Sequence, residues 1–453
     1  MEYLSLLLFA VIFLFLMFGF PVALTLAGAS LAFALIASAF GVFDMSFLQN
    51  VPSRIFGLMN NTTLMAVPLF VFMGIMLEQS KIAEQLLETM DELMQGVKGG
   101  LGISVILVGA LLAASTGIVG ATVVTMGLIA LPTMLKQGYC PKLASGTICA
   151  SGTLGQIIPP SIVLILLGDV LSSAYQQAQL NQGIFSPETL AVGDLFIGAI
   201  FPAMLLVVLY MLFVYLKAIF DPKSAPKAEK LTKGVDWTKL LSSLIPPLAL
   251  IGLVLGSILG GFATPTEAAS LGALGALVLA FIKKRLSLNV LQKVMQNSLK
   301  VTSMIFLIFI GAVFFSLTFR GLGGDDLIIE LLVDLPGGVF TAVLIVMVFM
   351  FILGFFLDFI EITYIIVPVV APVLLMMGVD PIWLGIMIAI NLQTAFLTPP
   401  FGFALFYLKG VAPNIKTTDL YKGVIPYIGI QIFVLIVLAF YPEMATWLPT
   451  VIY

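Results

Sequence analysis

Residues 151–161 read SGTLGQIIPPS, and they interrupt an otherwise apolar stretch of the chain. Glycine lets a backbone unwind, and proline removes a hydrogen-bond donor and breaks a helix. The proline pair at the end of this stretch recurs as Pro399-Pro400, 240 residues later (399 − 159 = 240). The same displacement relates three further pairs: Pro132 and Pro372, Gly138 and Gly378, and Pro141 and Pro381. We therefore expect two repeats, each containing one helix that is broken in its middle.

The composition is that of a membrane protein. Of 453 residues, 61% are hydrophobic and 9% are charged, whereas a soluble domain carries roughly 25% charged residues. Many separate apolar runs reach the ~20 residues that a helix needs to cross a bilayer. We therefore predict an all-α polytopic membrane protein that is embedded in a lipid bilayer and has no soluble domain of its own.

Several classes of function are disfavoured by what the chain lacks. It has no histidine, the commonest general base and metal ligand. Cys140 and Cys149 lie on either side of a predicted membrane boundary, so they indicate neither a disulfide framework nor a metal site. The glycine-rich residues 321–324 lack the Lys-Ser/Thr pair of a phosphate loop. We expect neither an enzyme, nor a nucleotide-driven pump, nor a nucleic-acid-binding protein.

The chain divides at its polar segments. Each repeat begins with apolar spans and an amphipathic helix, continues with a long apolar unit that suits a re-entrant helical hairpin, and ends with the broken helix. The predicted parts are spans with an amphipathic helix (1–100), hairpin and broken helix (101–170), a loop, span and lysine-rich linker (171–239), spans with a second arm helix (240–338), hairpin and broken helix (339–410), and a last span (411–453).

The distribution of basic residues predicts the orientation, because lysine and arginine accumulate on the cytoplasmic side of a membrane. Residues 217–239 and 283–285 are rich in basic residues and are therefore placed inside. Counting spans from there places both termini and residues 171–194 outside. It also places residues 78–98 inside and their repeat partner, 320–335, outside. The repeats are therefore predicted to be inverted, a topology that many secondary transporters use for alternating access.

The two interruptions carry groups that bind cations and anions. Hydroxyls and the carbonyls of unwound backbone suit a hard cation such as Na⁺, and the N-terminus of a half-helix favours an anion. A simpler interpretation is that small residues let helices pack closely. Because the two interruptions match in register, we favour function over packing. The candidates are Ser151, Gly152, Thr153, Pro159 and Pro160 in the first interruption, and Asn391, Gln393, Thr394, Thr398, Pro399 and Pro400 in the second.

The centres of the two hairpins supply the other candidates. Ser115 and Thr116 lie at the centre of the first hairpin and indicate a cation site, although such hydroxyls often bond within their own helix. Asp358 and Glu361 lie within the second, and intramembrane carboxylates are costly and suggest function by default. They could bind Na⁺ directly or carry protons, and both would share one helical face if the helix were continuous there. Glu267, at the start of a span, is expected to begin a helix and not to bind an ion.

These motifs resemble those of one known family. Together they are similar to the large membrane subunit of the tripartite ATP-independent periplasmic (TRAP) transporters, and the resemblance covers essentially the whole chain. The stretches that carry it are SGTLG (151–155), IPPS (158–161), GFATPTEAA (261–269), FLD (356–358) and LTPPFG (397–402).

The resemblance implies an inverted-repeat, elevator-type fold, in which a transport domain of two hairpins and two broken helices moves against a scaffold. It implies import of organic acids, usually carboxylates, with co-transported Na⁺ across the inner membrane of a bacterium or archaeon. Such a subunit works with a periplasmic substrate-binding protein and a small four-helix membrane subunit. The Na⁺ ligands that the resemblance implies are Ser115, Thr116, Gly152, Thr153 and Asp358, followed by Asn391, Thr394 and Thr398. We expect the substrate beside Ser151, Pro159, Pro160, Gln393, Pro399 and Pro400.

Two departures from the family pattern keep alternatives open. Glu361 adds a second acid after FLD, so a proton-coupled or stand-alone permease remains an alternative. The polar segment 172–194 is longer than expected, and it either contacts the binding protein or is an ornamental loop. No arginine lies within a span to clamp a carboxylate, so the anion is expected to rely on helix N-termini, hydroxyls and bound Na⁺. A channel is a third alternative, but it would need a continuous polar lining, and these spans are polar only at their centres.

Overall fold

The computed structural model is all-helical over the residues that it describes, which are 3–80, 82–94, 96–226 and 237–452. Among these residues, seven helices are long and apolar enough to cross a membrane, or up to nine if each bent pair of helices is one span. The prediction of an all-α polytopic membrane protein is confirmed. The chain forms two compact units, and each is described by itself.

Unit 1 consists of Met1–Met65, Leu166–Ala191 and Lys300–Gly385. Aromatic side chains hold its core together: Phe9 of the first helix lies 6.5 Å from the Phe315 ring and 5.9 Å from the Phe349 ring, measured between centroids. Its helices are α1 (Leu4–Met17), α2 (Val22–Ala39), α3 (Ser46–Gln49), α4 (Val51–Met59), most of α10 (Ile162–Asn181), the second part of α14 (Leu288–Gly321), α15 (Gly324–Val333), α16 (Gly338–Leu353), α17 (Phe359–Ile365) and α18 (Val367–Met376).

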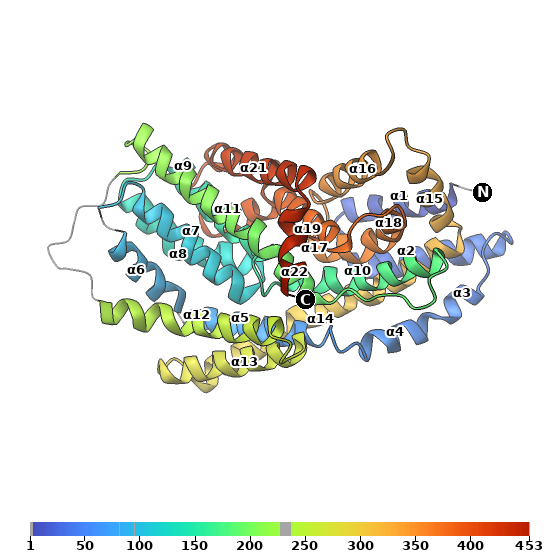
Figure 1. Cartoon of the computed structure of the whole chain (residues 1–453), viewed down its shortest axis with the longest axis horizontal. Helices are drawn as coiled ribbons and strands as arrows, with labels where there is room; N and C mark the ends of the chain where they lie inside the picture. Colours follow the sequence, from blue (N-terminus) through green and yellow to red (C-terminus); the bar gives the residue numbers. More distant parts are fainter. Residues whose placement is uncertain (1–2, 81, 95, 227–236, 453) are drawn as a thin grey trace. The chain divides into compact units, whose positions relative to one another are not determined.

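Unit 2 consists of Ala66–Ile165, Val192–Leu299 and Ile386–Tyr453. Helix α9 forms its centre, because every residue from Leu143 to Thr153 is buried, and α7, α8 and α21 pack around it (Figure 1). Its helices are α5 (Ala66–Gln79), α6 (Ile82–Leu93), α7 (Gly100–Thr116), α8 (Val119–Lys136), α9 (Pro141–Thr153), α11 (Val192–Phe220), α12 (Trp237–Leu259), α13 (Pro265–Ile282), the first part of α14, most of α19 (Pro381–Leu397), α20 (Phe403–Val411), α21 (Thr417–Phe440) and α22 (Glu443–Ile452).

Most predicted spans coincide with helices, and the polar segments between and after them also contain helices. The sequence predicts a loop over residues 171–193, but α10 continues to Asn181, because this stretch has neither glycine nor proline before Gly183. The polar segment 320–335, the repeat partner of residues 78–98, contains helix α15. Helix α22 follows the last predicted span. The predicted amphipathic helix at 78–98 is present as α6, and its apolar side chains Leu86, Leu87 and Met90 are buried.

Three parts of the sequence-based prediction are not decided by these helices. The inverted relation of the repeats and the division into transport domain and scaffold stay predictions. Of the lysine-rich linker, residues 227–236 lie outside the described residues.

Candidate functional site

The first broken helix is interrupted between Thr153 and Ile162, as predicted. Helix α9 ends at Thr153, a short 3₁₀ turn follows at residues 154–156, and α10 begins at Ile162. The Pro159-Pro160 peptide bond between them is cis. Gln156 is completely buried here, and neither polar atom of its side chain has a hydrogen-bonding partner among the described residues. Because buried polar groups are normally paired, an unpaired buried amide indicates a place that binds an ion, a water molecule or a ligand.

The second broken helix is interrupted between Leu397 and Phe403, again as predicted. The Pro399-Pro400 bond is also cis. Unlike the first interruption, this one reaches the surface: Pro400 is exposed, and its carbonyl accepts a hydrogen bond from the Tyr421 hydroxyl at 3.1 Å. A third proline pair, Pro246-Pro247, lies inside the continuous helix α12, so a proline pair alone does not decide where a helix breaks.

The hydroxyls of the second interruption satisfy their own helix. Thr394 donates to the Ile390 carbonyl at 2.7 Å, and Thr398 donates to the Thr394 carbonyl at 2.7 Å. Asn391 is buried nearby in the same helix. Back-bonding of this kind uses the hydroxyl proton and leaves the oxygen lone pairs available, so these residues keep the ability to bind a cation.

The two interruptions meet in unit 2. Gln393 Nε2 donates to Thr153 Oγ1 at 3.4 Å, and these two residues are separated by the repeat displacement of 240 (393 − 153 = 240). A residue can touch its own repeat partner only close to the axis that relates the repeats. On the predicted repeat relation, the axis passes between Thr153 and Gln393. The Tyr210 hydroxyl faces both of them and Gln431, and all four side chains are completely buried. We call these four residues the axial cluster.

Small residues let α9 pack closely against its neighbours. A Cβ atom at Gly152 would collide with Val123 of α8, and Gly109 of α7 leaves the space that the Ser151 side chain occupies. Ser151 donates to the Ile148 carbonyl of its own helix at 3.0 Å. Gly152 therefore lets α9 and α8 pack closely, as the simpler interpretation expects. Its backbone carbonyl is the group through which it could also bind an ion.

The first hairpin turns at Gly117, which has a left-handed φ of +61° between α7 and α8. Just before and after the turn, the hydroxyls of Thr116 and Thr122 share a hydrogen bond of 2.9 Å. Ser115 belongs to α7, but its side chain lies outside the described part of the structure. The helical hairpin is thus present, and its re-entrant insertion into the membrane stays a prediction.

The centre of the second hairpin lies in unit 1 and is a helix start. The helix is not continuous on the N-terminal side of the two acids, because α16 ends at Leu353 and Asp358 is the N-cap of α17. Asp358 Oδ1 accepts a hydrogen bond from Phe359 N at 2.6 Å, and Glu361 Oε2 accepts one from Asp358 N at 3.0 Å. Both acids thus form a capping box. Among the predicted Na⁺ ligands, Asp358 belongs to unit 1 and the others belong to unit 2.

The same motif begins α13, where Thr264 and Glu267 form a capping box. Glu267 Oε2 accepts from the Thr264 backbone N–H at 2.8 Å. The prediction that Glu267 begins a helix is therefore confirmed. This second capping box shows that a Glu at this position needs no ion to explain it.

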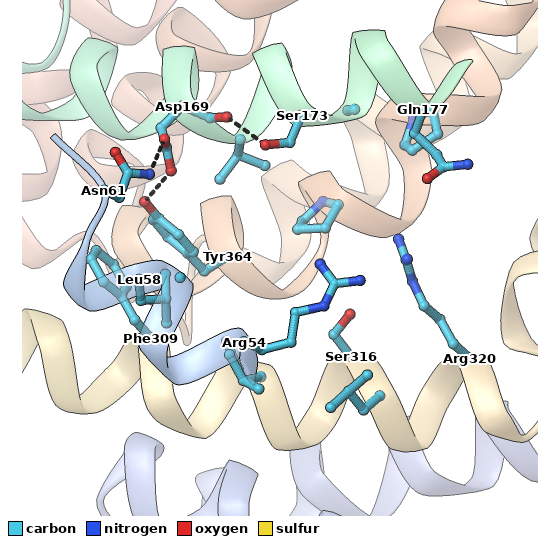
Figure 2. A pocket seen from close by; sticks show the side chains of 18 of the residues that line it. Arg54, Leu58, Asn61, Asp169, Ser173, Gln177, Phe309, Ser316, Arg320 and Tyr364 are labelled. Carbon is cyan, nitrogen blue, oxygen red and sulfur yellow. Dashed lines mark hydrogen bonds between the residues drawn. The ribbon is translucent and has the colours of Figure 1, made fainter. Parts of the chain in front are cut away.

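Unit 1 also contains a pocket of about 380 Å³ that the sequence reasoning missed (Figure 2). The available signal was Asp169, an acid within the predicted span at 143–170, followed at helical spacing by Ser173 and Gln177. Asp169 accepts hydrogen bonds from Asn61 Nδ2 at 2.7 Å and from the Tyr364 hydroxyl at 3.4 Å. The polar residues lining the pocket are Ser53, Arg54, Asn61, Asp169, Ser173, Gln177, Ser316, Arg320 and Tyr364.

Comparison with known proteins points to one family. Residues 9–444 match the family model described as "Tripartite ATP-independent periplasmic transporter, DctM component". The Vibrio cholerae C4-dicarboxylate TRAP transporter large permease DctM is 28% identical over 471 residues, covering 98% of this chain and 97% of that protein. The Escherichia coli 2,3-diketo-L-gulonate TRAP transporter large permease YiaN is also 28% identical and covers 94% of each chain.

Two further matches add to this. The isethionate TRAP transporter permease DctMQ of Oleidesulfovibrio alaskensis is 28% identical, covering 96% of this chain and 65% of that protein. Among solved structures, the Alcanivorax borkumensis YdaH transporter matches with a TM-score of 0.60 and 16% identity, covering 87% of this chain and 88% of that one. At this identity the structural match supports the fold alone.

Proposed function

The chain belongs to the tripartite ATP-independent periplasmic transporters as their DctM component, the large permease, and we propose that it imports organic acid anions together with Na⁺. Members of this family are multi-pass proteins of the inner membrane, which agrees with the long apolar helices found here. The relatives named above are transport permeases and not enzymes.

The observation that carries the coupling proposal is the contact between the two interruptions. Thr153 at the end of α9 contacts Gln393, about one turn before the end of α19, at a buried point of unit 2 that contains hydroxyl and amide oxygens. Oxygens of this kind are the ligands that broken membrane helices offer to Na⁺. Na⁺ bound there would favour the substrate-loaded state, since a ligand shifts an equilibrium only between states that it binds unequally. An elevator motion of the hairpins and broken helices would then carry both across the membrane.

The proposed cargo is a small organic anion, usually a carboxylate. The relatives are named for C4-dicarboxylate, 2,3-diketo-L-gulonate and isethionate, and all three are organic anions. The proposed partners are a periplasmic substrate-binding protein and a small four-helix membrane subunit. The DctMQ relative is longer than the part that this chain matches, which leaves room for a second component in that protein.

Uptake into membrane vesicles tests the coupling. Vesicles containing the full chain and its small subunit receive binding protein loaded with radiolabelled acid, in Na⁺ or in K⁺ at equal ionic strength. We expect uptake only with an inward Na⁺ gradient. Equal uptake in K⁺ would show that Na⁺ coupling is wrong.

The second candidate is proton coupling through the acids of the capping box, and the observation that favours it is the extra acid Glu361 beside Asp358. Asp358→Asn separates the two, because Asn keeps an oxygen that can accept from Phe359 N but cannot carry a proton. Under Na⁺ coupling, the variant needs about tenfold or more Na⁺ for half-maximal uptake, which corresponds to the ~1.5–3 kcal/mol of a charge-assisted bond. Under proton coupling, the variant instead loses the dependence of uptake on external pH.

A further inference from the structure

The pocket of unit 1 has two ends of different chemistry. At one end, Asp169 is held by Asn61 and Tyr364, and the Tyr364 ring lies 4.0 Å from the Phe309 ring. At the other end, Figure 2 shows Arg54 and Arg320 pointing into the cavity, with Ser316 between them. The carboxylate of Asp169 is therefore already paired and lies away from the two guanidinium groups.

Helical spacing explains how the two ends arise. On α10, Asp169, Ser173 and Gln177 follow at intervals of four and share one face. On α14, Phe309 lies at the Asp169 end and Arg320 lies three turns further on. The pocket thus has an aromatic end, at Phe309 and Tyr364, and a basic end, at Arg54 and Arg320.

The two arginines at the basic end of the pocket keep N–H hydrogen-bond donors available. Arg320 Nε contacts Asp325 Oδ2 at 3.3 Å, which holds the guanidinium in place and uses one of its five N–H donors. Its side chain is 29% exposed. Arg54 is exposed, and no ion pair of Arg54 is present among the described residues. Two guanidinium groups that face one cavity suit a carboxylate or sulfonate, which accepts hydrogen bonds through more than one oxygen.

The positions of Arg54 and Arg320 are not explained by the accumulation of basic residues on the cytoplasmic side of a membrane. The chain has three arginines and seventeen lysines. On the predicted topology, all the lysines and Arg285 lie on the cytoplasmic side, whereas Arg54 and Arg320 lie outside. Basic residues are depleted on that side of a membrane, so two of them around a single cavity require another reason.

We propose that this pocket is an outward-facing capture site, in which Arg54 and Arg320 bind the anionic group of the transported acid. The body of the acid lies toward Phe309 and Tyr364, where Asp169 and Asn61 accept or donate hydrogen bonds to its hydroxyl or oxo groups. The inference rests on the proposed function for the identity of its ligand. It gives unit 1 a binding site of its own, in addition to the interruptions and the axial cluster of unit 2.

Equilibrium binding to the purified full chain tests the site without the binding protein. The probes are radiolabelled succinate, 2,3-diketo-L-gulonate and isethionate, each up to millimolar concentration. For the acid that binds, Arg54→Gln and Arg320→Gln are each expected to raise the dissociation constant about tenfold, as expected for losing one charge-assisted bond. Arg285→Gln removes the remaining arginine of the chain and is expected to change nothing. Failure of all three acids to bind the wild-type chain would overturn the proposal.

A second control separates binding from local folding. Asp325→Asn breaks the ion pair of Arg320 but keeps the guanidinium, so affinity should be kept or increased. An equal loss of affinity in Asp325→Asn and Arg320→Gln would mean that the pair only holds α15 in place, and the proposal would be wrong.

Assays of protein association and of uptake separate a capture site from a protein-docking surface and from the Na⁺ coupling. If the arginine variants bind the acid normally but no longer associate with the periplasmic binding protein, the arginines dock a protein and the capture site is refuted. If uptake is equal in Na⁺ and K⁺ while acid binding still depends on both arginines, the sodium coupling fails and the capture site stands. If uptake is Na⁺-dependent and unchanged in both arginine variants, the coupling stands and the capture site fails.

Discussion

The two interruptions of unit 2 are related by the repeat, yet they differ in burial and polarity. In the first, Gln156 is buried and unpaired. Its repeat partner in the second is Phe396 (396 − 156 = 240), whose ring packs 5.0 Å from Phe403. The first interruption is enclosed, whereas Pro400 of the second is exposed. Two elements at matching positions of the repeats thus form a polar buried break and a break that is open to the surface, and we expect only the first to contribute a side-chain amide from its break.

The substitution Gln156→Leu removes the polar group that sets the first interruption apart from the second. We expect Na⁺-dependent uptake at limiting Na⁺ to fall about tenfold or more, because one amide ligand is lost. Stability should not fall, because the substitution replaces an unpaired buried amide with an apolar side chain of similar size. Uptake assays and unfolding in detergent measure the two effects.

Phe396→Leu is the matched control: it should cost roughly 1 kcal/mol or more of packing and keep the Na⁺ dependence. Normal uptake in Gln156→Leu would contradict the assignment.

Gly152→Ala tests how tightly the first interruption is enclosed. The added Cβ collides with Val123, and overpacking of this kind costs about 1–3 kcal/mol. We expect a lower midpoint of thermal unfolding. The control is Gly410→Ala in α20, where nothing lies within 4 Å of the added Cβ and alanine is the better helix former. Equal unfolding midpoints for the two variants would show that α9 is packed more loosely than the structure indicates.

The contact between the interruptions is measured by a double-mutant cycle. Thr153→Val and Gln393→Leu each remove one partner of the hydrogen bond that joins the repeats. We expect a coupling free energy of about 0.5–1.5 kcal/mol between them in chemical unfolding, the range of a single hydrogen bond. Thr147→Val paired with Gln393→Leu serves as the reference, since Thr147 bonds to Tyr427 instead. A coupling free energy no larger than in this reference pair would show that the two interruptions do not stabilise each other through this hydrogen bond.

The smallest effect is expected at the exposed break. Tyr421→Phe removes the hydrogen bond to the Pro400 carbonyl, which water can replace there. The free energy of unfolding should change by at most about 0.5 kcal/mol. A loss of several times this value would indicate that the second interruption is as enclosed as the first, which would remove the difference between them.

The proline and glycine motifs predicted the interrupted helices well, because these residues change the backbone locally. The breaks after Thr153 and Leu397 fall where the motifs place them, and so does the turn at Gly117. Pro246-Pro247 shows the limit of this reasoning, because the same dipeptide lies within a continuous helix there. Asp358 and Glu361 were predicted to lie at the centre of the second hairpin, and the spacing of these two acids is itself a local signal of a capped helix start that the sequence reasoning did not use there.

Hydropathy, the repeat displacement and the family motifs are enough to establish the class of the protein, an all-helical membrane transporter with two broken helices. They do not reveal which distant residues share a site. Thr153 meets Gln393 across 240 residues, and Arg54, Asp169 and Arg320 meet around one pocket although three separate segments carry them. The physical reason is that helix breaking and membrane burial depend on neighbouring residues, whereas a binding site depends on how helices pack, and packing is a property of the whole fold.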